Sequence, residues 1–279
     1  TMKLLISIEY RTRWGEQLVM RIGKRRIALQ YADGGIWTGA IDRYTQRDDT
    51  EYRYEIERDG TCIRSEWRPH TLRLPSREGV RTLRIRDRWQ EMPSDTPFYS
   101  SAFTRGIFGR GKTGNPKKAA GNITLRVVLP TLRPDETLAV AGSGRELGDW
   151  KRIVPMDDSR FPEWELTLHT AHRFEYKFLI ADRKTLTLWE EGANRTWGEL
   201  PGAGEHALDA AAYPRFPERR WRGAGTAIPV FSLRTEEDFG VGEFYDLKRL
   251  IDWAAATGQR VIQVLPINDT TMTGTWEDS

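Results

Sequence analysis

Two tryptophans near the middle of the chain lie in polar surroundings. Trp150 belongs to the polar segment 148–152, and Trp189 is followed directly by Glu190 and Glu191. Polar turns of this kind are poor settings for a buried indole, so both rings are expected at the surface. A flat indole suits the C–H face of a pyranose ring, whereas charged and amide side chains suit its hydroxyl edge. Two indoles set at an angle would fit a bent α-glucan better than a straight β-glucan. The alternative is that both rings are core residues, as we expect for Trp164.

Two other motifs could in principle bind a nucleotide or a metal ion, but neither is expected to do so. Gly106–Thr113 spells G-x-x-x-x-G-K-[ST], the pattern of a phosphate-binding loop. Such a loop needs a strand before it and a helix after it, but no strand-like segment precedes it and Asn115 is followed by Pro116. We interpret the match as chance within a linker. His169 and His172 are three residues apart without a third ligand nearby, which favours surface positions over a metal site. No metal or cofactor is expected.

Composition excludes several classes of protein. The 279 residues include 11 tryptophans, and Lys+Arg exceeds Asp+Glu by only 3, with the two signs interspersed. A nucleic-acid footprint is therefore not indicated. The single cysteine, Cys62, cannot form an intramolecular disulfide. The charged N-terminal segment and the lack of a long apolar run predict neither a signal peptide nor a membrane span, so a cytoplasmic location is expected.

The elements that must position these residues are mostly short strands. Alternating or β-branched segments bounded by Gly, Asp and Pro predict two sets of strands. The first set is Leu4–Glu9, Leu18–Ile22, Ile36–Ile41, Tyr52–Glu57 and Arg81–Arg86. The second set is Ile123–Leu129, Thr137–Val140, Trp164–Leu168, Phe174–Ile180 and Thr185–Trp189. The Gly-, Ser-, Lys- and Pro-rich stretch 93–121 between them predicts an exposed linker.

The two sets of strands repeat each other. Glu51–Tyr54 parallels Glu175–Phe178, which lies 124 positions later (175 minus 51). Trp37 likewise parallels Trp164, and Trp67 parallels Trp189. Landmarks at nearly one spacing predict a duplicated β-sandwich of about 100 residues per copy. We call residues 1–92 the first repeat and residues 122–213 the second repeat.

The pattern changes after Pro214. Thr226–Phe231 is an apolar run suited to a buried parallel strand, and 244–255 carries apolar residues at helical spacing before Gly258. Val261–Leu265 is a second apolar strand. Strand, helix and strand in this order predict one βαβ unit.

The second repeat resembles family 20 carbohydrate-binding modules, the starch-binding domains. Leu147–Trp150, Glu175–Phe178 and Trp189–Arg195 match that family's signature in order and spacing, over about Asn122–Leu208. The resemblance implies that Trp150 and Trp189 form a platform for α-1,4-linked glucose. It also implies that Lys177 and Asn194 bond sugar hydroxyls and that Glu190 lies in the same site.

The first repeat resembles the same family less closely. Gly23–Arg26 stands where the Leu-Gly-Asp-Trp turn should be, and Arg53 replaces the lysine. Trp14, followed by Gly and Glu, resembles a segment whose aromatic residue serves a second glucan site in the family, and Tyr31 falls near that site's other aromatic residue. The first repeat is therefore either a second binding site built on Trp14 and Tyr31 or a degenerate spacer.

The third region resembles glycoside hydrolase family 77, the 4-α-glucanotransferases. Ala227–Arg234 looks like the first strand of that family's (β/α)₈ barrel, Phe239–Phe244 like the start of its first helix, and Gln263–Thr270 like its second strand and loop. The ends of these strands imply a substrate rim that contains Ser232, Arg234, Asn268 and Asp269. The family's aspartate nucleophile and glutamate acid/base lie on later strands, so catalytic residues are expected beyond residue 279.

The sequence thus predicts a mostly β chain: two tandem starch-binding β-sandwich modules followed by the first βαβ unit of a truncated (β/α)₈ barrel. The expected boundaries are 1–92, 93–121 for the linker, 122–213 and 214–279. The implied function is the α-1,4-glucan-binding region of a retaining 4-α-glucanotransferase, with starch, glycogen or maltooligosaccharides as ligands and no activity in this segment alone. The alternative is a non-enzymatic glycogen- or starch-binding adaptor. Neither a nucleic acid nor a membrane is an expected partner, and the oligomeric state stays open.

Overall fold

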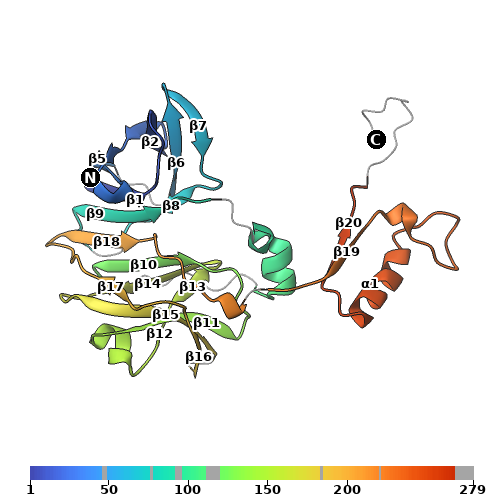
Figure 1. Cartoon of the computed structure of the whole chain (residues 1–279). Helices are drawn as coiled ribbons and strands as arrows, with labels where there is room; N and C mark the ends of the chain where they lie inside the picture. The colour runs from blue at the N-terminus through green and yellow to red at the C-terminus, as the bar shows by residue number, and fades with distance from the viewer. Residues whose placement is uncertain are drawn as a thin grey trace. The chain divides into compact units, whose positions relative to one another are not determined.

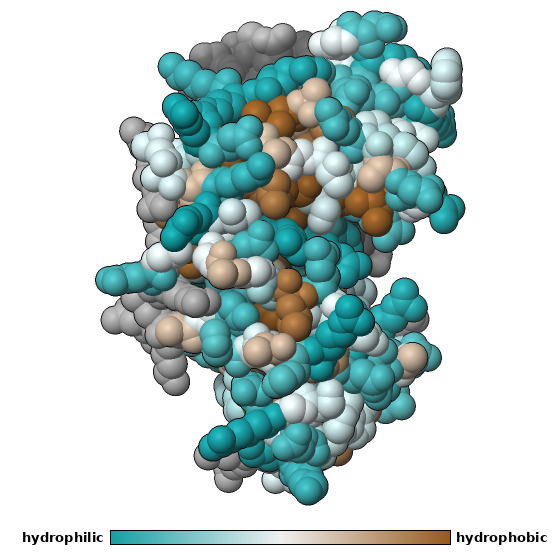
Figure 2. All heavy atoms as spheres, turned by 90° about the vertical axis from the view of Figure 1, so that its left-hand side faces the viewer, coloured by the Kyte–Doolittle hydropathy of each residue, from teal (hydrophilic) through white to brown (hydrophobic). Residues whose placement is uncertain are grey.

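The chain forms two compact units in the computed structural model, Thr1–Arg219 and Arg220–Ser279 (Figure 1). The structure describes residues 1–45, 49–75, 78–91, 96–110, 120–182, 185–219 and 221–267. The elements in these ranges are mostly strands, which confirms the mostly β prediction. On the face of the molecule shown in Figure 2, hydrophobic side chains form separate small patches among hydrophilic ones.

The first repeat consists of two groups of strands that enclose a hydrophobic core. One group contains β4, β5, β1 and β9, and the other contains β3, β2, β6 and β7, with β8 paired to β6. Alternate residues of β1 point inward, so Leu4, Ile6 and Ile8 are buried against Leu18 and Met20 of β2. The strands are β1 (Met2–Glu9), β2 (Glu16–Ile22), β3 (Arg25–Ala28), β4 (Gln30–Tyr31), β5 (Ile36–Tyr44), β6 (Thr50–Arg58), β7 (Thr61–Ser65), β8 (His70–Leu72) and β9 (Thr82–Arg88).

The second repeat has its own core between two corresponding groups of strands. β13, β14, β10 and β18 form one group, and β12, β11, β15 and β16 form the other, with β17 paired to β15. In β15 the buried Phe174, Tyr176 and Phe178 alternate with Glu175 and Lys177, which point outward. The strands are β10 (Ile123–Val128), β11 (Glu136–Gly142), β12 (Val154–Pro155), β13 (Asp157–Arg160), β14 (Glu163–Leu168), β15 (Phe174–Asp182), β16 (Thr185–Trp189), β17 (Arg195–Trp197) and β18 (Glu205–Asp209).

One strand that the sequence did not predict joins the repeats into a single sheet. β18 pairs in parallel with β10 of its own repeat and also with β9 of the first repeat. The result is an eight-stranded sheet in the order β13-β14-β10-β18-β9-β1-β5-β4 (Figure 1). Residues in register on parallel strands share a face, so Leu208 lies beside Ile85 in the first core, whereas Ala207 lies beside Ile123 of the second core. The two cores therefore occupy opposite faces of the shared sheet.

Arginines reinforce this junction. The Nη1 of Arg126 in the second repeat donates to the Thr71 carbonyl in the first, at 2.9 Å, and its Nε donates to Glu165 at 2.6 Å. Arg73 in the first repeat pairs with the same Glu165 at 2.9 Å. Because the ladder, the Arg126–Thr71 hydrogen bond and the Arg73–Glu165 ion pair cross between the repeats, residues 1–219 pack as one unit.

The predicted exposed linker is in part buried. Within its described residues it contains two short helical segments, Thr96–Tyr99 and Ala102–Ile107. Arg110 then enters the second repeat, where its Nε donates to the Leu132 carbonyl at 3.1 Å and its guanidinium lies 4.8 Å from the Trp164 ring. Arg110 is buried because it finds carbonyl and aromatic partners that are distant in sequence. The phosphate-loop motif continues into residues 111–113, which lie outside the described residues.

The strand register relates the two repeats residue by residue. Trp37 lies opposite Ile8 on β1, and Trp164 lies opposite Val127 on β10; both indoles are buried and donate to a backbone carbonyl. Glu55 and Leu179 are equivalent positions of the two repeats, because they are 124 residues apart. Ser65 pairs with Glu55, whereas Trp189 pairs with Leu179, so Ser65 is the equivalent of Trp189. The predicted equivalence of Trp67 with Trp189 was therefore wrong. Identical residue type misled the alignment, and the first repeat has a serine at that position.

A buried titratable cluster sits in the first repeat. His70 lies between two carboxylates, with its Nε2 2.9 Å from Glu66 Oε1 and its Nδ1 3.6 Å from Asp87 Oδ1. The hydroxyls of Tyr52 and Tyr54 donate to the other Asp87 oxygen at 2.8 and 2.7 Å. Burial lowers the pKa of His70, but Asp87 and Glu66 more than compensate, so its pKa lies above the ordinary 6.5.

This cluster predicts a pH dependence of stability. The folded state holds the His70 proton more tightly than the unfolded state does. Protonated His70 therefore stabilises the folded protein fully below the ordinary pKa, and this stabilisation is lost as pH rises through the folded pKa. Urea unfolding of the wild type and His70→Gln across that range is the test. The wild type should lose free energy of unfolding relative to the variant as pH increases. Parallel pH curves for the two proteins would contradict the assignment.

The second unit contains the predicted strand, helix and strand. β19 (Gly225–Ile228) and β20 (Val261–Val264) pair in parallel, and α1 (Asp246–Ala256) lies between them in sequence. The first strand ends three residues earlier than predicted, because Val230–Ser232 forms a short 3₁₀ turn after Pro229. Asp246 starts the helix, accepting the Glu243 amide at 2.7 Å. None of the helices within the described ranges has the length and apolar character required to span a lipid bilayer.

Candidate functional site

Trp150 and Trp189 lie side by side on the surface of the second repeat. Their ring centroids are 6.3 Å apart and their planes are tilted by 49°. The two residues remain 40% and 38% exposed, well above the core tryptophan Trp164, which is fully buried. Both indoles thus present surface to solvent from one place, and their tilt makes the pair angled rather than flat.

A strained turn holds Trp150 at the surface. Gly148, Asp149 and Trp150 have consecutive positive φ values of 80°, 50° and 60°. Two of these residues are not glycine, and left-handed backbone of this kind costs on the order of 1 kcal/mol or more per residue. Leu147 is buried in the core and anchors the turn, and the Lys151 amide donates to the Gly148 carbonyl at 2.9 Å. The fold therefore stabilises an otherwise unfavourable conformation that brings Trp150 out of the sandwich.

Glu190, which the resemblance implies lies in the same site, is buried. Its Oε1 accepts the Phe178 amide at 2.9 Å, and both of its oxygens accept hydrogen bonds from Arg195, at 2.9 and 2.8 Å. Direct hydrogen bonding raises the pKa of Arg195, consistent with a paired guanidinium. Because the carboxylate points inward, Glu190 fixes the end of β16 and so positions Trp189.

Lys177 and Asn194 lie at the surface beside the loop after β16. Lys177 Nζ donates to the Gly192 carbonyl at 2.6 Å, and Asn194 Nδ2 donates to Glu175 Oε2 at 3.2 Å. The interaction with Glu175 was not predicted, although Glu175 is two residues before Lys177 and therefore on the same face of β15. These contacts hold the ammonium and amide groups close to the chain segment that follows Trp189.

The arrangement can recognise a ligand that has an apolar face and a polar edge. Tilted indoles offer stacking surface, and ammonium and amide groups offer hydrogen bonds. Within the described part of the chain, no group of three or more His, Cys, Asp or Glu side chains could hold a metal ion. The indole, ammonium and amide groups suit the site to ligand binding.

The candidate residues of the first repeat have a different geometry. Trp14 is fully exposed, and Tyr31 is 61% exposed with its ring edge-on to Trp37 at a centroid distance of 5.5 Å. The Tyr31 hydroxyl accepts the Gly35 amide at 3.3 Å. Trp67, the other tryptophan considered for this repeat, packs against Tyr99 at 5.5 Å. The first repeat thus has no counterpart to the Trp150–Trp189 pair at the corresponding positions of its described residues.

The predicted rim residues of the second unit are held in local interactions. Ser232 Oγ donates to the Pro229 carbonyl at 2.9 Å, and Arg234 Nε donates to Asp238 at 2.9 Å. The pKa of Asp238 is lowered, first by the Gly240 amide and then by Arg234. Asn268 and Asp269 lie outside the described residues.

Two family models match the chain. Residues 121–200 match the starch binding domain, and residues 228–279 match 4-alpha-glucanotransferase. The 4-alpha-glucanotransferase DPE2 of Oryza sativa subsp. japonica is 31% identical across 100% of this chain, which covers 33% of that relative. The 4-alpha-glucanotransferase of Chlamydia trachomatis is 52% identical over 46 residues, 16% of this chain and 9% of the relative.

Solved structures are also similar. A family 20 carbohydrate-binding module of a maltotetraose-forming amylase from Pseudomonas saccharophila matches 31% of this chain and 97% of its own, with 20% identity and a TM-score of 0.27. The chain spans about a third of the length of the rice relative. The sequence matches over residues 121–200 and 228–279, together with the rice relative aligned along the whole chain, confirm the family assignment made from the sequence. The matches support a fragment of a 4-alpha-glucanotransferase with a starch-binding domain.

Proposed function

We propose that this chain binds α-1,4-glucans at the platform formed by Trp150 and Trp189. The observation that carries the proposal is the pair of exposed rings, 6.3 Å apart and tilted by 49°. Successive glucose units of an α-1,4 chain turn relative to one another, so two angled indoles can each cover a C–H face. Lys177 and Asn194 lie beside the platform and supply donors for the hydroxyl edge.

The platform is proposed to serve a retaining 4-α-glucanotransferase. The whole enzyme would transfer an α-1,4-glucosyl unit through a covalent glycosyl-enzyme intermediate, which an acceptor sugar rather than water resolves. In such an enzyme the platform would raise the local concentration of starch, glycogen or maltodextrin near the catalytic site. The match of residues 228–279 to the glucanotransferase family supports the enzyme rather than the adaptor.

The finer architecture is part of the same proposal. We propose two tandem starch-binding modules at 1–92 and 122–213, a linker at 93–121, and the first βαβ unit of a (β/α)₈ barrel at 214–279. The parallel pairing of β19 with β20 around α1 supports the barrel assignment, and Ser232, Arg234, Asn268 and Asp269 are proposed for the substrate rim. The first repeat is proposed either to bind glucan weakly through Trp14 and Tyr31 or to serve as a spacer. A cytoplasmic location is proposed from the composition.

Calorimetric titration of the chain with maltoheptaose and with cellohexaose tests the function. The α-1,4 oligosaccharide should bind at least about tenfold more tightly, a difference of about 1.4 kcal/mol. The chain should also release no glucose from maltotriose, because it spans only about a third of the length of the rice relative. Equal affinity for the two sugars, or no affinity for maltoheptaose, would contradict the proposal.

A further inference from the structure

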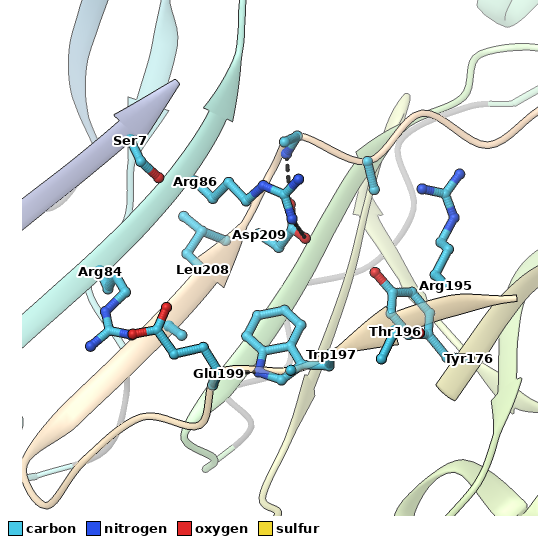
Figure 3. Close-up of a pocket in the computed structure, with 14 residues that line it drawn as sticks. Ser7, Arg84, Arg86, Tyr176, Arg195, Thr196, Trp197, Glu199, Leu208 and Asp209 are labelled. Carbon is cyan, nitrogen blue, oxygen red and sulfur yellow. Dashed lines mark hydrogen bonds and ion pairs between the residues drawn. The ribbon is translucent and has the colours of Figure 1, made fainter. Parts of the chain in front are cut away.

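A recess lies at the junction of the two repeats (Figure 3), and neither Trp150 nor Trp189 is among the residues that line it. Its volume is about 380 Å³, within the range of small-molecule sites. The first repeat contributes residues of β1 and β9, and the second contributes residues of β15, β17 and β18. The residues proposed to bind the ligand are Arg86, Trp197 and Asp209.

Trp197 supplies an aromatic wall with a fixed orientation. One face of its ring stacks on Phe174, with centroids 5.9 Å apart and planes within 9° of parallel. Its Nε1 donates to the Glu199 carbonyl at 2.9 Å. The indole is therefore held on one face and at its nitrogen, while part of the ring still lines the recess. A pre-positioned aromatic surface loses little conformational entropy when a ligand packs against it.

Arg86 and Asp209 form a loosely paired donor and acceptor on the opposite wall (Figure 3). The closest approach between Arg86 Nη1 and Asp209 Oδ2 is 3.8 Å, beyond hydrogen-bond distance. The Arg86 side chain is 66% exposed, whereas that of Asp209 is almost buried, and Asp209 Oδ1 accepts the Ala211 amide at 2.9 Å. Burial raises the pKa of Asp209. A ligand hydroxyl can bridge such a pair, since it both donates and accepts.

The other arginines that line the recess are already paired with carboxylates, and this favours a neutral ligand over an anionic one. Arg84 is bound to Glu199 at 2.7 Å and to Glu205 at 3.0 Å. Arg195 is bound by both oxygens of Glu190 and also donates to a backbone carbonyl. Arg86 is thus the one arginine among the described lining residues whose carboxylate partner lies beyond hydrogen-bond distance. One loosely paired cation beside a carboxylate favours a polyhydroxyl ligand over a phosphate.

We infer that this recess binds a glucosyl unit of the α-glucan as a second sugar site of the unit Thr1–Arg219. Trp197 covers the C–H face of the sugar, and Arg86 and Asp209 bind hydroxyls at its edge. The inference rests on the proposed glucan binding but uses none of the platform residues. Because the walls come from both repeats, a bound sugar also contacts strands of both repeats.

The experiment uses the whole chain with the platform removed. In Trp150→Ala/Trp189→Ala, maltotetraose should still shift the Trp197 indole N–H signal in ¹⁵N–¹H spectra, in a saturable manner. The signal is assigned by its loss in Trp197→Phe. Adding Arg86→Ala should weaken this binding at least about tenfold. The matched control Arg25→Ala removes an exposed arginine of β3 outside the recess and should leave the binding unchanged.

The outcomes separate this inference from the proposed function. In the wild type, the indole N–H signals of Trp150 and Trp189 should follow one binding curve and that of Trp197 another. This measurement does not depend on the double variant. If the platform signals shift but Trp197 does not at saturating maltotetraose, the recess inference is overturned and the proposed function stands. A Trp197 shift with inorganic phosphate and none with maltotetraose also overturns the inference. No shift anywhere in the wild type overturns both.

Discussion

Replacing Trp150 or Trp189 by alanine is expected to weaken maltoheptaose binding by at least about 30-fold, or about 2 kcal/mol, the cost that defines a binding hot spot. Each indole supplies one of the two stacking surfaces, and with a single ring the angled platform no longer exists. The double variant should show no binding of maltoheptaose at the platform. Calorimetry of the whole chain measures the loss without relying on tryptophan fluorescence.

The loss should be specific to binding. Both side chains are more than a third exposed, so their truncation should change the free energy of unfolding by less than about 1 kcal/mol. Trp253→Ala is a matched control, because Trp253 is an exposed tryptophan on α1 of the other unit. An affinity within about threefold of the wild type for Trp150→Ala and Trp189→Ala would show that the platform does not bind the glucan.

Glu190→Ala is expected to lower the free energy of unfolding by about 2–4 kcal/mol. The substitution leaves the buried Phe178 amide without its acceptor and removes both hydrogen bonds from Arg195. It also frees the end of β16, so maltoheptaose affinity should fall even though Glu190 does not face the ligand. Urea unfolding followed by circular dichroism, together with calorimetry, measures the two effects.

Two variants sharpen the Glu190 experiment. Glu190→Gln keeps an oxygen for the Phe178 amide but loses the charge, so it should retain part of the stability. Glu191→Ala removes the neighbouring carboxylate, which is exposed, and should be neutral. A loss of stability for Glu190→Ala no greater than that for Glu191→Ala would contradict the buried role.

Local sequence pattern predicts those strands whose two faces differ in polarity. β15 alternates Phe174, Tyr176 and Phe178 with charged residues, and its observed bounds contain the predicted ones. β18 was missed because it is only five residues long and lacks β-branched residues. Its place between β10 and β9 depends on partners that are distant in the chain, and no local pattern records them.

The exposure of a site residue was predictable where the types of its sequence neighbours decide it. It was not predictable where partners distant in the sequence decide it. The polar turn around Trp150 correctly indicated an exposed ring. The burial of Glu190 was not predictable, because it depends on Arg195 and the Phe178 amide, which compensate it. Trp67 was matched to Trp189 by residue type, whereas strand register assigns Ser65.

A crystal structure of the chain with β-cyclodextrin, a cyclic α-1,4-glucan, tests the binding account most directly. We predict that adjacent glucose rings lie with their C–H faces against Trp150 and Trp189 and that Lys177 or Asn194 bonds their hydroxyls. Cyclodextrin bound elsewhere, with both indoles left uncovered, would contradict the account.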